Sequence, residues 1–532
     1  MLSRIAPSML SRARRVADAP RAAASLRHAA AASLRRASRR FGAAPRLAVA
    51  ERSARYAELS SDDVAAFRTM TSSVLEGAEA CRPYNVDWMS KWEGRARVVL
   101  RPASTAEVSA ILKYCDARRL AVVPQGGKTG LVGGSVPVHD EVVLSLARMD
   151  RIEAFDADTG VATMEAGVVL GDLDAFLRER GFVAPLDLGA SGTCTVGGNL
   201  ATNAGGVRFV RYGSLRGSCV GVEFVKADGT VVDCASVPLR KDNTGYALPQ
   251  LLIGSEGTLG VITRLALAAP PRPSAVSVAW LACDDFDGVR GALALARRHL
   301  AEVLSAIEFV DGNALRAVLD RERDLDDPLA GGAARFRVLV ECAGSDGAHD
   351  GAKLERFLEA AFDDGCVSDG VLAPSATKAE RLWRLREGVS DSMTAAGFVY
   401  KYDVSLPHAH LYRLVDECRD RLAAAGFPDG EEINVAGYGH VGDANLHLNV
   451  CDFFGYREPL RAALEPWVFE RVAALGGSVS AEHGVGQCKT DYLHLNKPPP
   501  ALALMAELKR AMDPNLILNP YKVLPPALLD EP

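Results

Sequence analysis

The chain has 532 residues, of which 48% are hydrophobic and 24% are charged, and its formal net charge at pH 7 is −6. This length predicts two or three domains, and no stretch approaches the roughly 18 apolar residues that a membrane-spanning helix needs. The eleven cysteines are scattered and form no C-x-x-C pair, which argues against a disulfide framework and against a zinc ribbon.

The first 46 residues differ from the rest of the sequence. They contain eleven arginines, no lysine and one acidic residue, Asp18, among many Ala and Ser residues. This composition is typical of a mitochondrial transit peptide, so we expect residues 1–50 to be a leader to the matrix, removed between Arg36 and about Ala54. The alternative is a basic tail that binds nucleic acid. The leader would carry a charge of about +10 and the remaining chain about −16, which disfavours a nucleic-acid partner.

A helical lead-in is expected over 55–95, followed by a region, 96–272, in which short apolar runs alternate with glycine clusters. A helix is predicted at 105–119, where four apolar residues recur at helical spacing after two residues that can cap it, Ser104 and Thr105. The other apolar runs have the length and composition of strands. Strands are predicted at 96–102, 120–124, 141–146, 161–168, 220–233 (as a hairpin) and 257–267.

A proline-rich joint at 270–273 marks a change in the pattern. Beyond it, strands predicted at 276–283, 306–311 and 336–344 alternate with helices predicted at 286–300 and 351–362. Such units suggest a separate α+β domain over 273–477, with one sheet and its helices packed on one face. The last segment, 478–532, contains an E-H-G-V-G cluster and a predicted helix at 499–513, and we expect it to return to the first domain. The expected fold class is α+β.

One glycine motif is misleading. Gly127-Lys128-Thr129 resembles the end of a phosphate-binding P-loop, but that motif requires a glycine five residues before Gly127, where Val122 stands. A strand is predicted at that place instead. No G-x-G-x-x-G lies between a predicted strand and a predicted helix either. The sequence therefore disfavours hydrolysis of a nucleoside triphosphate and a Rossmann-type NAD site.

Two segments, 124–134 and 192–206, are unusually rich in glycine. Without a Cβ atom the backbone can approach a ligand closely, and successive N–H groups can converge on an anion. Interleaved Thr and Asn residues add neutral hydrogen-bond partners, so the lining suits a pyrophosphate and a ring with amide-like edges. The alternative is a glycine-rich barrel corner or surface loop.

Three motifs, PQGGKTGLVGG, GTCTVGGNLATNAGG and IGSEGTLGVIT, resemble in order and spacing the FAD-binding domain of the vanillyl-alcohol oxidase-type flavoenzymes. The resemblance implies a PCMH-type FAD domain over 96–272, a substrate-binding cap over 273–477, and the FAD pyrophosphate on the loop 126–130. The FAD is expected to be non-covalent, because the first loop lacks the histidine that often carries a covalent flavin. Lys128 stands where many relatives have Asn, so no role is carried over to its side chain. The residues assigned to the cofactor are Gln125, Gly126, Gly127, Thr129, Gly130, Gly197, Gly198, Asn199, Thr202, Asn203, Gly206, Glu256, Gly257, Ile262 and Asn519.

The segment 437–450 predicts a β-hairpin with one histidine in each strand. If Asp443-Ala444 is the two-residue tip, His440 lies directly opposite His447, with Cβ atoms about 5 Å apart. Two imidazoles so placed can share one metal ion, and Glu482 is the natural candidate for a third ligand. Two histidines and a carboxylate leave a position open for substrate, as in catalytic zinc sites and in non-haem iron sites. The alternative is two histidines satisfied by hydrogen bonds near a turn.

Three further side chains can supply a base and two positive charges. His483, beside Glu482, can be a general base, because an imidazole titrates near pH ~6.5. Arg386 offers a planar fork that can pair with a carboxylate in bidentate fashion, and Lys401 supplies a second positive charge. For either cation the alternative is a solvated surface charge.

The motifs GYGHVGDANLHLNV and SAEHGVG resemble the family of D-2-hydroxyglutarate and D-lactate dehydrogenases, and the likeness spans about residues 60 to 525. It implies that His440, His447 and Glu482 bind zinc or another divalent metal. It also implies substrate-binding roles for Arg386, Ser390, Lys401 and Asn449. Position 390 is usually Thr in relatives.

The resemblance implies an FAD-dependent oxidation of D-2-hydroxyglutarate to 2-oxoglutarate, assisted by the metal, with hydride transfer to the flavin. The electrons would pass to an external acceptor, an electron-transfer flavoprotein or a quinone, and the candidate assembly is a homodimer. One alternative is a sister enzyme for D-lactate or glycolate, distinguished by whether a second carboxylate changes turnover. Another is a non-catalytic flavin-binding protein, against which the joint presence of the metal ligands, His483 and Arg386 speaks.

Overall fold

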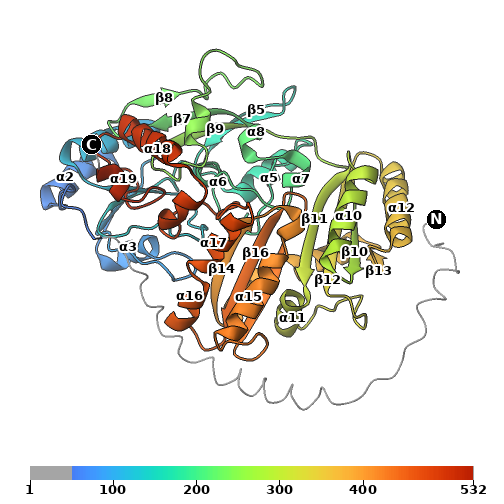
Figure 1. The fold of residues 1–532 in the computed structure, drawn as a ribbon. Coiled ribbons are helices and arrows are strands. Elements are labelled where there is room, and N and C mark those ends of the chain that lie inside the picture. The colour runs from blue at the N-terminus through green and yellow to red at the C-terminus, as the bar shows by residue number, and fades with distance from the viewer. Residues whose placement is uncertain (1–50, 531–532) are drawn as a thin grey trace. The chain divides into compact units, whose positions relative to one another are not determined.

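Three β-sheets organise residues 51–530, the part of the chain that this computed structural model describes (Figure 1). All of these residues belong to the unit Pro45–Pro532. The leader predicted for residues 1–50 lies outside the described residues. None of the described helices is long and apolar enough to cross a membrane.

Two smaller sheets form the part of the molecule that carries the glycine segments, which we call the glycine-loop half. Their strand orders are β1-β2-β4-β3, with parallel pairing of β4 to β2 and to β3, and β5-β6-β9-β7-β8, which is antiparallel. Each strand predicted between residues 96 and 267 has a counterpart here, and β7 and β8 form the predicted hairpin. The strands are β1 (Val74–Glu76), β2 (Val98–Leu100), β3 (Val122–Gln125), β4 (Val142–Ser145), β5 (Ile152–Asp156), β6 (Val161–Glu165), β7 (Cys219–Val225), β8 (Val231–Asp233) and β9 (Val261–Ala268).

The helix predicted from hydrophobic spacing is α4 (Thr105–Arg118), and its four apolar residues are fully buried. It begins after Ser104, whose hydroxyl accepts a hydrogen bond from the N–H of Glu107 at 3.3 Å. It ends at Arg119, which lies in the left-handed region at φ 53°. The other helices of this half are α2 (Ser61–Met70), α3 (Ala78–Asn85), α5 (Leu170–Arg178), α6 (Val196–Thr202), α7 (Phe209–Tyr212), α8 (Leu215–Ser218) and α9 (Pro249–Leu252).

A seven-stranded antiparallel sheet with its helices forms the other part, which we call the cap half. Its order is β13-β10-β12-β11-β15-β16-β14. The strands are β10 (Ala275–Cys283), β11 (Leu304–Asp311), β12 (Phe336–Gly344), β13 (Asp369–Leu372), β14 (Phe398–Ser405), β15 (Ile433–His440) and β16 (Asn445–Asp452). The helices are α10 (Phe286–His299), α11 (Gly312–Arg321), α12 (Gly347–Asp364), α13 (Ala376–Glu387), α14 (Val389–Ala396), η1 (His408–His410), α15 (Arg413–Ala424), α16 (Glu458–Leu464) and α17 (Trp467–Ala474).

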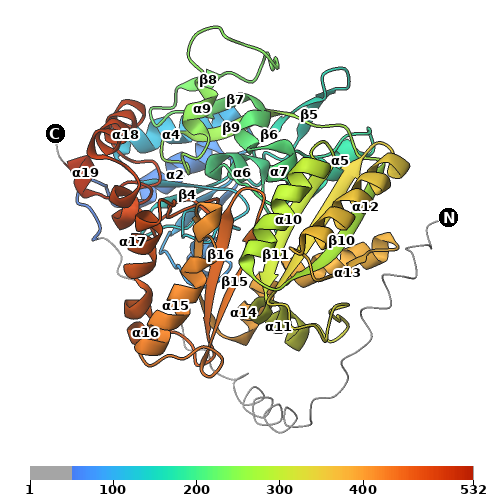
Figure 2. The same cartoon turned by 45° about the vertical axis from the view of Figure 1, so that its right-hand side comes forward.

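Helices cover both faces of this sheet, so the expectation of helices on one face is wrong. Alternate residues of β10 enter different cores: Leu281 packs with α10, α12 and α15, whereas Trp280 packs with α11, α13 and α14. Figure 2 shows α10 and α12 on one side of these strands. The sequence itself indicates two covered faces, because residues 278–283 are all apolar, and a strand covered on both faces shows no alternation with polar residues. All six of these residues are buried in the structure.

The C-terminal segment contains η2 (Thr490–Leu495), α18 (Pro499–Met512) and α19 (Ala527–Asp530). Leu518 forms a parallel bridge to Val122 of β3, and the N–H of Asn519 donates to the Val122 carbonyl at 2.8 Å. The segment after α18 therefore lies against the first sheet of the glycine-loop half.

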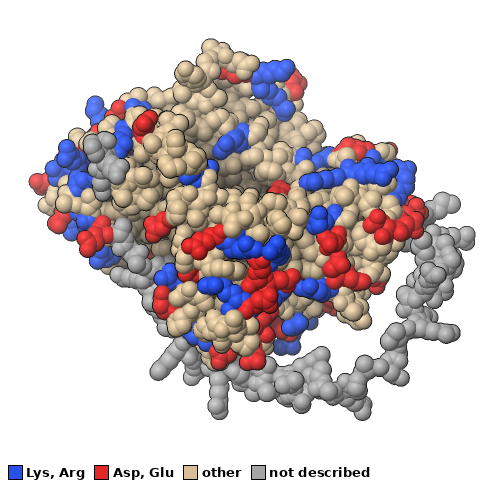
Figure 3. Space-filling model, viewed as in Figure 1, with Lys and Arg blue, Asp and Glu red and all other residues tan. Residues whose placement is uncertain are grey.

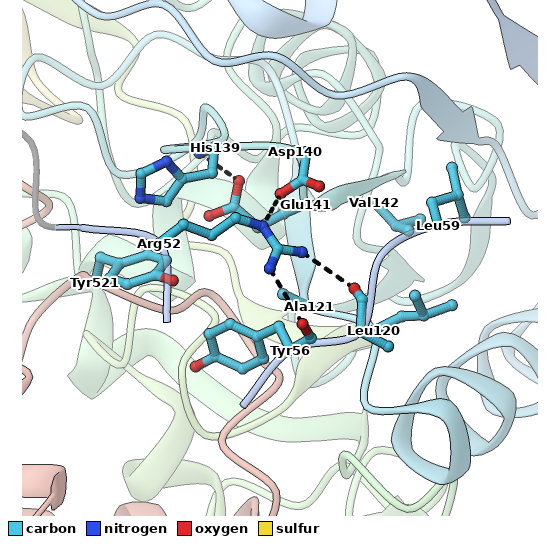
Figure 4. A pocket seen from close by; sticks show the side chains of 11 residues that line it. Arg52, Tyr56, Leu59, Leu120, Ala121, His139, Asp140, Glu141, Val142 and Tyr521 are labelled. Carbon is cyan, nitrogen blue, oxygen red and sulfur yellow. Dashed lines mark hydrogen bonds and ion pairs between the residues drawn. The ribbon is translucent and has the colours of Figure 1, made fainter. Parts of the chain in front are cut away.

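Arg52 fixes the start of the described chain to the same region (Figure 4). Its Nε donates to Oδ1 of Asp140 at 2.6 Å, and one of its Nη atoms donates to the carbonyl of Tyr56 at 3.1 Å. The N–H of Ser53 donates to the hydroxyl of Tyr521 at 2.9 Å. The first described residues are thus joined to the last turns of the chain.

Acidic and basic side chains are interleaved on the face shown in Figure 3, over the helices of the cap half. Ion pairs within the cap helices α15 and α16 include Arg413 with Glu417 at 2.8 Å and Arg461 with Glu458 at 3.0 Å. This face therefore lacks the continuous basic surface that binding to a phosphate backbone needs.

Candidate active site

The histidine hairpin has a longer turn than the sequence predicted. β15 and β16 pair with His440 opposite Asn445, so the loop contains the four residues 441–444. Of the two predicted tip residues only Ala444 has a positive φ, 64°, whereas a tight two-residue hairpin usually needs this conformation at both positions. The predicted opposition of His440 and His447 is therefore wrong by two residues. Because side chains alternate with a period of two, an even shift leaves both histidines on one face.

His440 and His447 still face each other at the centre of this site. Their Nε2 atoms are 3.4 Å apart, and Oε1 of Glu482 lies 3.7 Å from each of them. Ligand atoms that lie ~2.0–2.2 Å from a tetrahedral zinc ion are separated by about 3.3–3.6 Å. The triangle of these three atoms, which we call the ligand triangle, therefore fits one divalent metal ion.

A second group of donors overlaps the ligand triangle. Asp403, His447, Glu482 and His483 each place one donor atom within 4.8 Å of the others. The Asp403 carboxylate is already engaged, however, because Oδ2 accepts the backbone N–H groups of residues 481–483 and Oδ1 accepts Nδ2 of Asn445 at 2.8 Å. We therefore favour the ligand triangle as the metal position.

Two carboxylates hold the segment 481–486 from the two halves of the molecule. From the cap half, Asp403 accepts three consecutive N–H groups at the start of the segment, at 2.8–3.1 Å. From the glycine-loop half, Glu256 accepts two N–H groups at its end, at 2.7 and 2.8 Å. Gly484 between them has φ 83°, and a Cβ there would lie 2.7 Å from the Glu256 carboxylate. The segment that carries Glu482 and His483 is thus held at both ends.

Two of the three groups of the ligand triangle, Glu482 and His447, are held in the protonation states that bind a metal. Burial alone would raise the pKa of Glu482, but hydrogen bonding to His440 and the charge of the histidines outweigh it and lower the pKa to about 2. Burial lowers the pKa of His447 to about 3. For His440 burial is outweighed by the Glu308 carboxylate, which raises the pKa. An ionised Glu482 and a neutral His447 are the forms that bind a metal ion.

The predicted substrate residues adjoin the ligand triangle. β14 and β16 pair Lys401 directly with Asn449, on the face that carries His447. Nζ of Lys401 donates to Oγ of Ser390 at 2.7 Å, and Nδ2 of Asn449 donates to the hydroxyl of Tyr438 at 3.0 Å. Burial, with a smaller contribution from a neighbouring lysine, lowers the pKa of Lys401 to about 8. The fold thus brings Lys401, Ser390 and Asn449 into one polar group.

Arg386, at the end of α13, is 5% exposed and is not among the residues that line the cavity described below. Its Nε donates to Oε2 of Glu308 at 3.0 Å, and Nη2 lies 2.7 Å from the same oxygen. Its guanidinium lies 5.1 Å from the centre of the Tyr438 ring. One edge of the predicted fork is therefore occupied within the protein, while Nη1 has no hydrogen-bond partner among the residues that the structure describes.

A cavity of about 920 Å³ lies between the glycine segments and the segment 481–486, a volume that suits a large cofactor. Nine residues beyond the glycine-loop half also line it, among them Ser390, Glu482 and the predicted base His483. The His483 ring stacks on His447, with centroids 5.6 Å apart. The predicted cofactor residues that line the cavity are Gln125, Gly126, Gly127, Thr129, Gly130, Gly197, Gly198, Asn199, Thr202, Glu256, Gly257 and Ile262.

Three predicted cofactor residues do not line this cavity. Asn203 caps the end of α6 at φ 49°, and its side chain accepts a hydrogen bond from Ser214 at 3.0 Å. Gly206 donates its N–H to Glu482. Asn519 is 2% exposed and donates to the carbonyl of Glu256 at 2.6 Å. In this structure each of them supports a neighbouring wall.

The first glycine loop offers a cradle for an anion. Among the described residues, the backbone N–H groups of 127–130 have no hydrogen-bond partner. Lys128 lies in the left-handed region at φ 58°, a conformation in which successive N–H groups can gather around an anion. A Cβ on Gly127 would lie 2.2 Å from the carbonyl of Thr193, so only glycine allows the two segments to meet. This arrangement fits the diphosphate of FAD.

Comparison with known sequences agrees with this geometry. Residues 96–235 match the family described as FAD binding domain, and residues 272–523 match the C-terminal domain of FAD linked oxidases. The mitochondrial D-2-hydroxyglutarate dehydrogenase of Bos taurus is 49% identical over 471 residues, covering 88% of this chain and 85% of the relative. That of Arabidopsis thaliana is 46% identical over 480 residues, covering 90% and 84%. The chain belongs to the D-2-hydroxyglutarate dehydrogenase family.

The fold of this dehydrogenase has solved counterparts. p-Cresol methylhydroxylase with substrate bound superimposes with a TM-score of 0.71 at 16% identity, covering 88% of this chain and 97% of the other. A likeness at this identity concerns the fold alone. It confirms the predicted α+β class with a vanillyl-alcohol oxidase-type FAD fold, and the matched domains confirm FAD as the cofactor.

The site of this dehydrogenase contains two carboxylates that the sequence analysis missed, Asp403 and Glu308. Asp403 follows Lys401 by two positions in the run YKYDVS, so strand periodicity places both on one face and could have found it. Glu308 lies between apolar residues in the run AIEFVD, which ends on a second acid, Asp311. Its pairing with His440 joins strands 132 residues apart, and no local pattern predicts such a pair.

Proposed function

We propose that this chain oxidises D-2-hydroxyglutarate to 2-oxoglutarate with non-covalent FAD and a divalent metal, for which zinc is the first candidate. The observation that carries the proposal is the position of the ligand triangle beside two cationic side chains, Arg386 and Lys401. A 2-hydroxy diacid needs one site for its hydroxyl group and positive charge for its two carboxylates. The names of the relatives from Bos taurus and Arabidopsis thaliana support this substrate.

The residues around the cavity divide the chemistry. When bound, FAD supplies a two-electron oxidant for the Cα–H bond, and a metal lowers the pKa of the hydroxyl group. His483 accepts the hydroxyl proton while the carbon–oxygen double bond forms. Oδ2 of Asp403 keeps His483 in place by accepting the backbone N–H of His483 at 2.8 Å. His440, His447 and Glu482 would hold the metal.

The cationic side chains favour a diacid over a monoacid. Lys401, which lies beside Ser390 and Asn449, provides an ammonium group, and Arg386 provides Nη1. A substrate with a single carboxylate, such as D-lactate or glycolate, can neutralise only one of these two charges. Arg386 already has Glu308 as a counter-ion, whereas Lys401 has no ion pair among the described residues, so a monoacid bound at Arg386 would leave Lys401 uncompensated. Because a partly buried cation without a counter-ion is costly, the diacid should be the better substrate.

The setting of the reaction is part of the proposal. The arginine-rich composition of residues 1–46 supports import into the mitochondrial matrix, and the relatives are named as mitochondrial proteins. Reduced flavin must be reoxidised in every cycle, so we infer an electron-transfer flavoprotein or a quinone as acceptor. A homodimer is the proposed assembly.

The deciding experiment is a panel of D- and L-2-hydroxy acids tested by anaerobic bleaching of the enzyme-bound flavin in one turnover. D-2-hydroxyglutarate should reduce the flavin much faster than its L-isomer, and faster than D-lactate or glycolate. Faster reduction by D-lactate would replace the proposed substrate with a monoacid. Equal rates with both isomers would refute the pocket geometry, and no reduction by any acid would leave a flavin-binding protein without this activity.

A further inference from the structure

We infer that Glu308 is a positioning residue that ties the substrate-binding arginine to the metal position through a single carboxylate. The inference rests on the proposed function for the roles of Arg386 and His440. Glu308 lies on β11, is 1% exposed, and is paired with His440 in the β11–β15 ladder. Its two oxygens are divided between two partners. Oε1 lies 2.9 Å from Nδ1 of His440, and Oε2 accepts from Nε of Arg386 at 3.0 Å.

The contact between Glu308 and His440 sets the tautomer of the imidazole. An ionised carboxylate only accepts hydrogen bonds, so the proton of the neutral ring resides on Nδ1. The Nε2 lone pair is then free toward the ligand triangle, where Nε2 of His447 lies 3.4 Å away. A carboxylate behind a metal-binding histidine fixes the ring orientation and raises its basicity.

The contact between Glu308 and Arg386 sets the orientation of the guanidinium group. Glu308 occupies the Nε side of the guanidinium, and the Tyr438 ring lies 5.1 Å from its centre. The group is therefore held on one edge and on one face, and Nη1 remains for a carboxylate of the substrate. Without Glu308 this buried cation would have no anionic partner among the described residues.

Another buried acid of the same sheet is engaged by other partners. Glu341 on β12 is bound by Arg208, by the hydroxyl of Ser305 at 2.8 Å and by Nε1 of Trp383 at 2.8 Å. It is 3% exposed and belongs to the same sheet. Glu341 therefore serves as a matched control, since it is a buried carboxylate that touches neither His440 nor Arg386.

The chemistry of a Glu308→Gln substitution makes the inference testable. If the oxygen of the amide accepts from Arg386, its NH2 group faces Nδ1 of His440, so the ring proton must move to Nε2 and the lone pair for the metal is lost. In the opposite orientation the NH2 group faces the Arg386 guanidinium, and two donors oppose each other. We expect a loss of about 10–100-fold in metal affinity, in kcat/KM for D-2-hydroxyglutarate, or in both. Arg386→Ala should reduce kcat/KM while leaving metal affinity near that of the wild type, because Glu308 still holds His440.

The measurement is competition for Zn²⁺ between the flavin-loaded protein and a chelator of known affinity, followed by kinetics at saturating Zn²⁺. Glu341→Gln should keep wild-type metal affinity. If Glu308→Gln keeps both metal affinity and kcat/KM within twofold of the wild type, the inference is overturned. Should that variant lose flavin or fold, Glu308→Asp replaces it, because its shorter side chain reaches only one partner. Metal affinity is read without substrate, so failure of the proposed substrate leaves this test intact.

Discussion

Gly206 donates its backbone N–H to Oε2 of Glu482 at 2.7 Å, so a glycine of the second glycine segment holds a carboxylate of the ligand triangle. The neighbouring Gly205 also lies against this carboxylate, because a Cβ added to Gly205 would lie 2.7 Å from the same oxygen. One wall therefore serves the cofactor cavity on one side and the metal position on the other. Coupling of this kind is reciprocal, so FAD should change the metal affinity by the same factor as the metal changes the FAD affinity.

We expect Gly205→Ala to lower Zn²⁺ affinity about 10–100-fold, because the added methyl group displaces the Glu482 carboxylate. FAD should remain bound. The control is Gly192→Ala in the same segment, where an added Cβ meets nothing within 4 Å. Chelator competition measures the affinity, and flavin absorbance of the same sample reports cofactor content. Equal Zn²⁺ affinities in the two variants would show that the wall does not transmit to the metal.

Replacing His483 by Ala should slow flavin reduction by about 10²–10⁴, the value of a general base. The segment should stay in place, because Asp403 accepts the backbone N–H of this residue at 2.8 Å, and alanine keeps that group. FAD and Zn²⁺ contents should therefore match the wild type. Stopped-flow bleaching with saturating D-2-hydroxyglutarate measures the rate, and a variant that bleaches at nearly the wild-type rate would assign the base elsewhere.

The charge of Lys401 predicts a pH dependence. Burial lowers its pKa to about 8, so the ammonium group is present below that pH and loses its proton as pH rises through it. Substrate carboxylates then lose a partner, and kcat/KM for D-2-hydroxyglutarate should fall above pH ~8, since this parameter reports the free enzyme. Arginine stays charged throughout this range. In Lys401→Arg the fall should shift out of the range, and an unchanged profile in this variant would exclude Lys401 as its source.

Lys128 should strengthen FAD binding through the diphosphate. It lines the cavity beside the N–H groups of 127–130, donates to the carbonyl of Pro83, and has no ion pair among the described residues. We expect Lys128→Gln to weaken FAD binding about tenfold, or about 1.4 kcal/mol. Riboflavin, which lacks the diphosphate, should bind both proteins equally, and the exposed Lys241→Gln is the control. Fluorescence titration of the flavin-free protein measures both affinities. An equal loss of affinity for FAD and for riboflavin in Lys128→Gln would contradict a role of Lys128 at the diphosphate.

The proposed leader should be cleaved before Arg52. That side chain binds Asp140 and the carbonyl of Tyr56, and the next N–H binds Tyr521. Cleavage after Ser53 would remove all of these hydrogen bonds, so the range expected from charge alone, which extended to about Ala54, narrows. N-terminal sequencing of the protein isolated from mitochondria tests this, and a mature chain starting beyond Ser53 would contradict it.

Local patterns were enough for much of the fold. Ser104 and four apolar residues at helical spacing give α4 its start and its buried face, and the glycine segments do meet at one cavity. The sequences of the cap helices did not predict which face of the seven-stranded sheet each helix covers. The uninterrupted apolar run in β10 did indicate that both faces are covered. The pairing of Glu308 with His440 depends on β11 lying next to β15, a neighbourhood set by the whole sheet order.

The two faces of the cap sheet are finished in different ways. Helices α11, α13 and α14 cover one part of the face that carries Trp280. The part with Asp403 and His447 is covered instead by the segment 481–486 and the glycine-loop half, through Glu256 and Gly206. The boundary between the halves thus takes the place of a missing layer of helices. Each half has a hydrophobic core of its own, so what the boundary completes is the site, and separating the halves would take Glu256 and Gly206 away from the segment that carries Glu482.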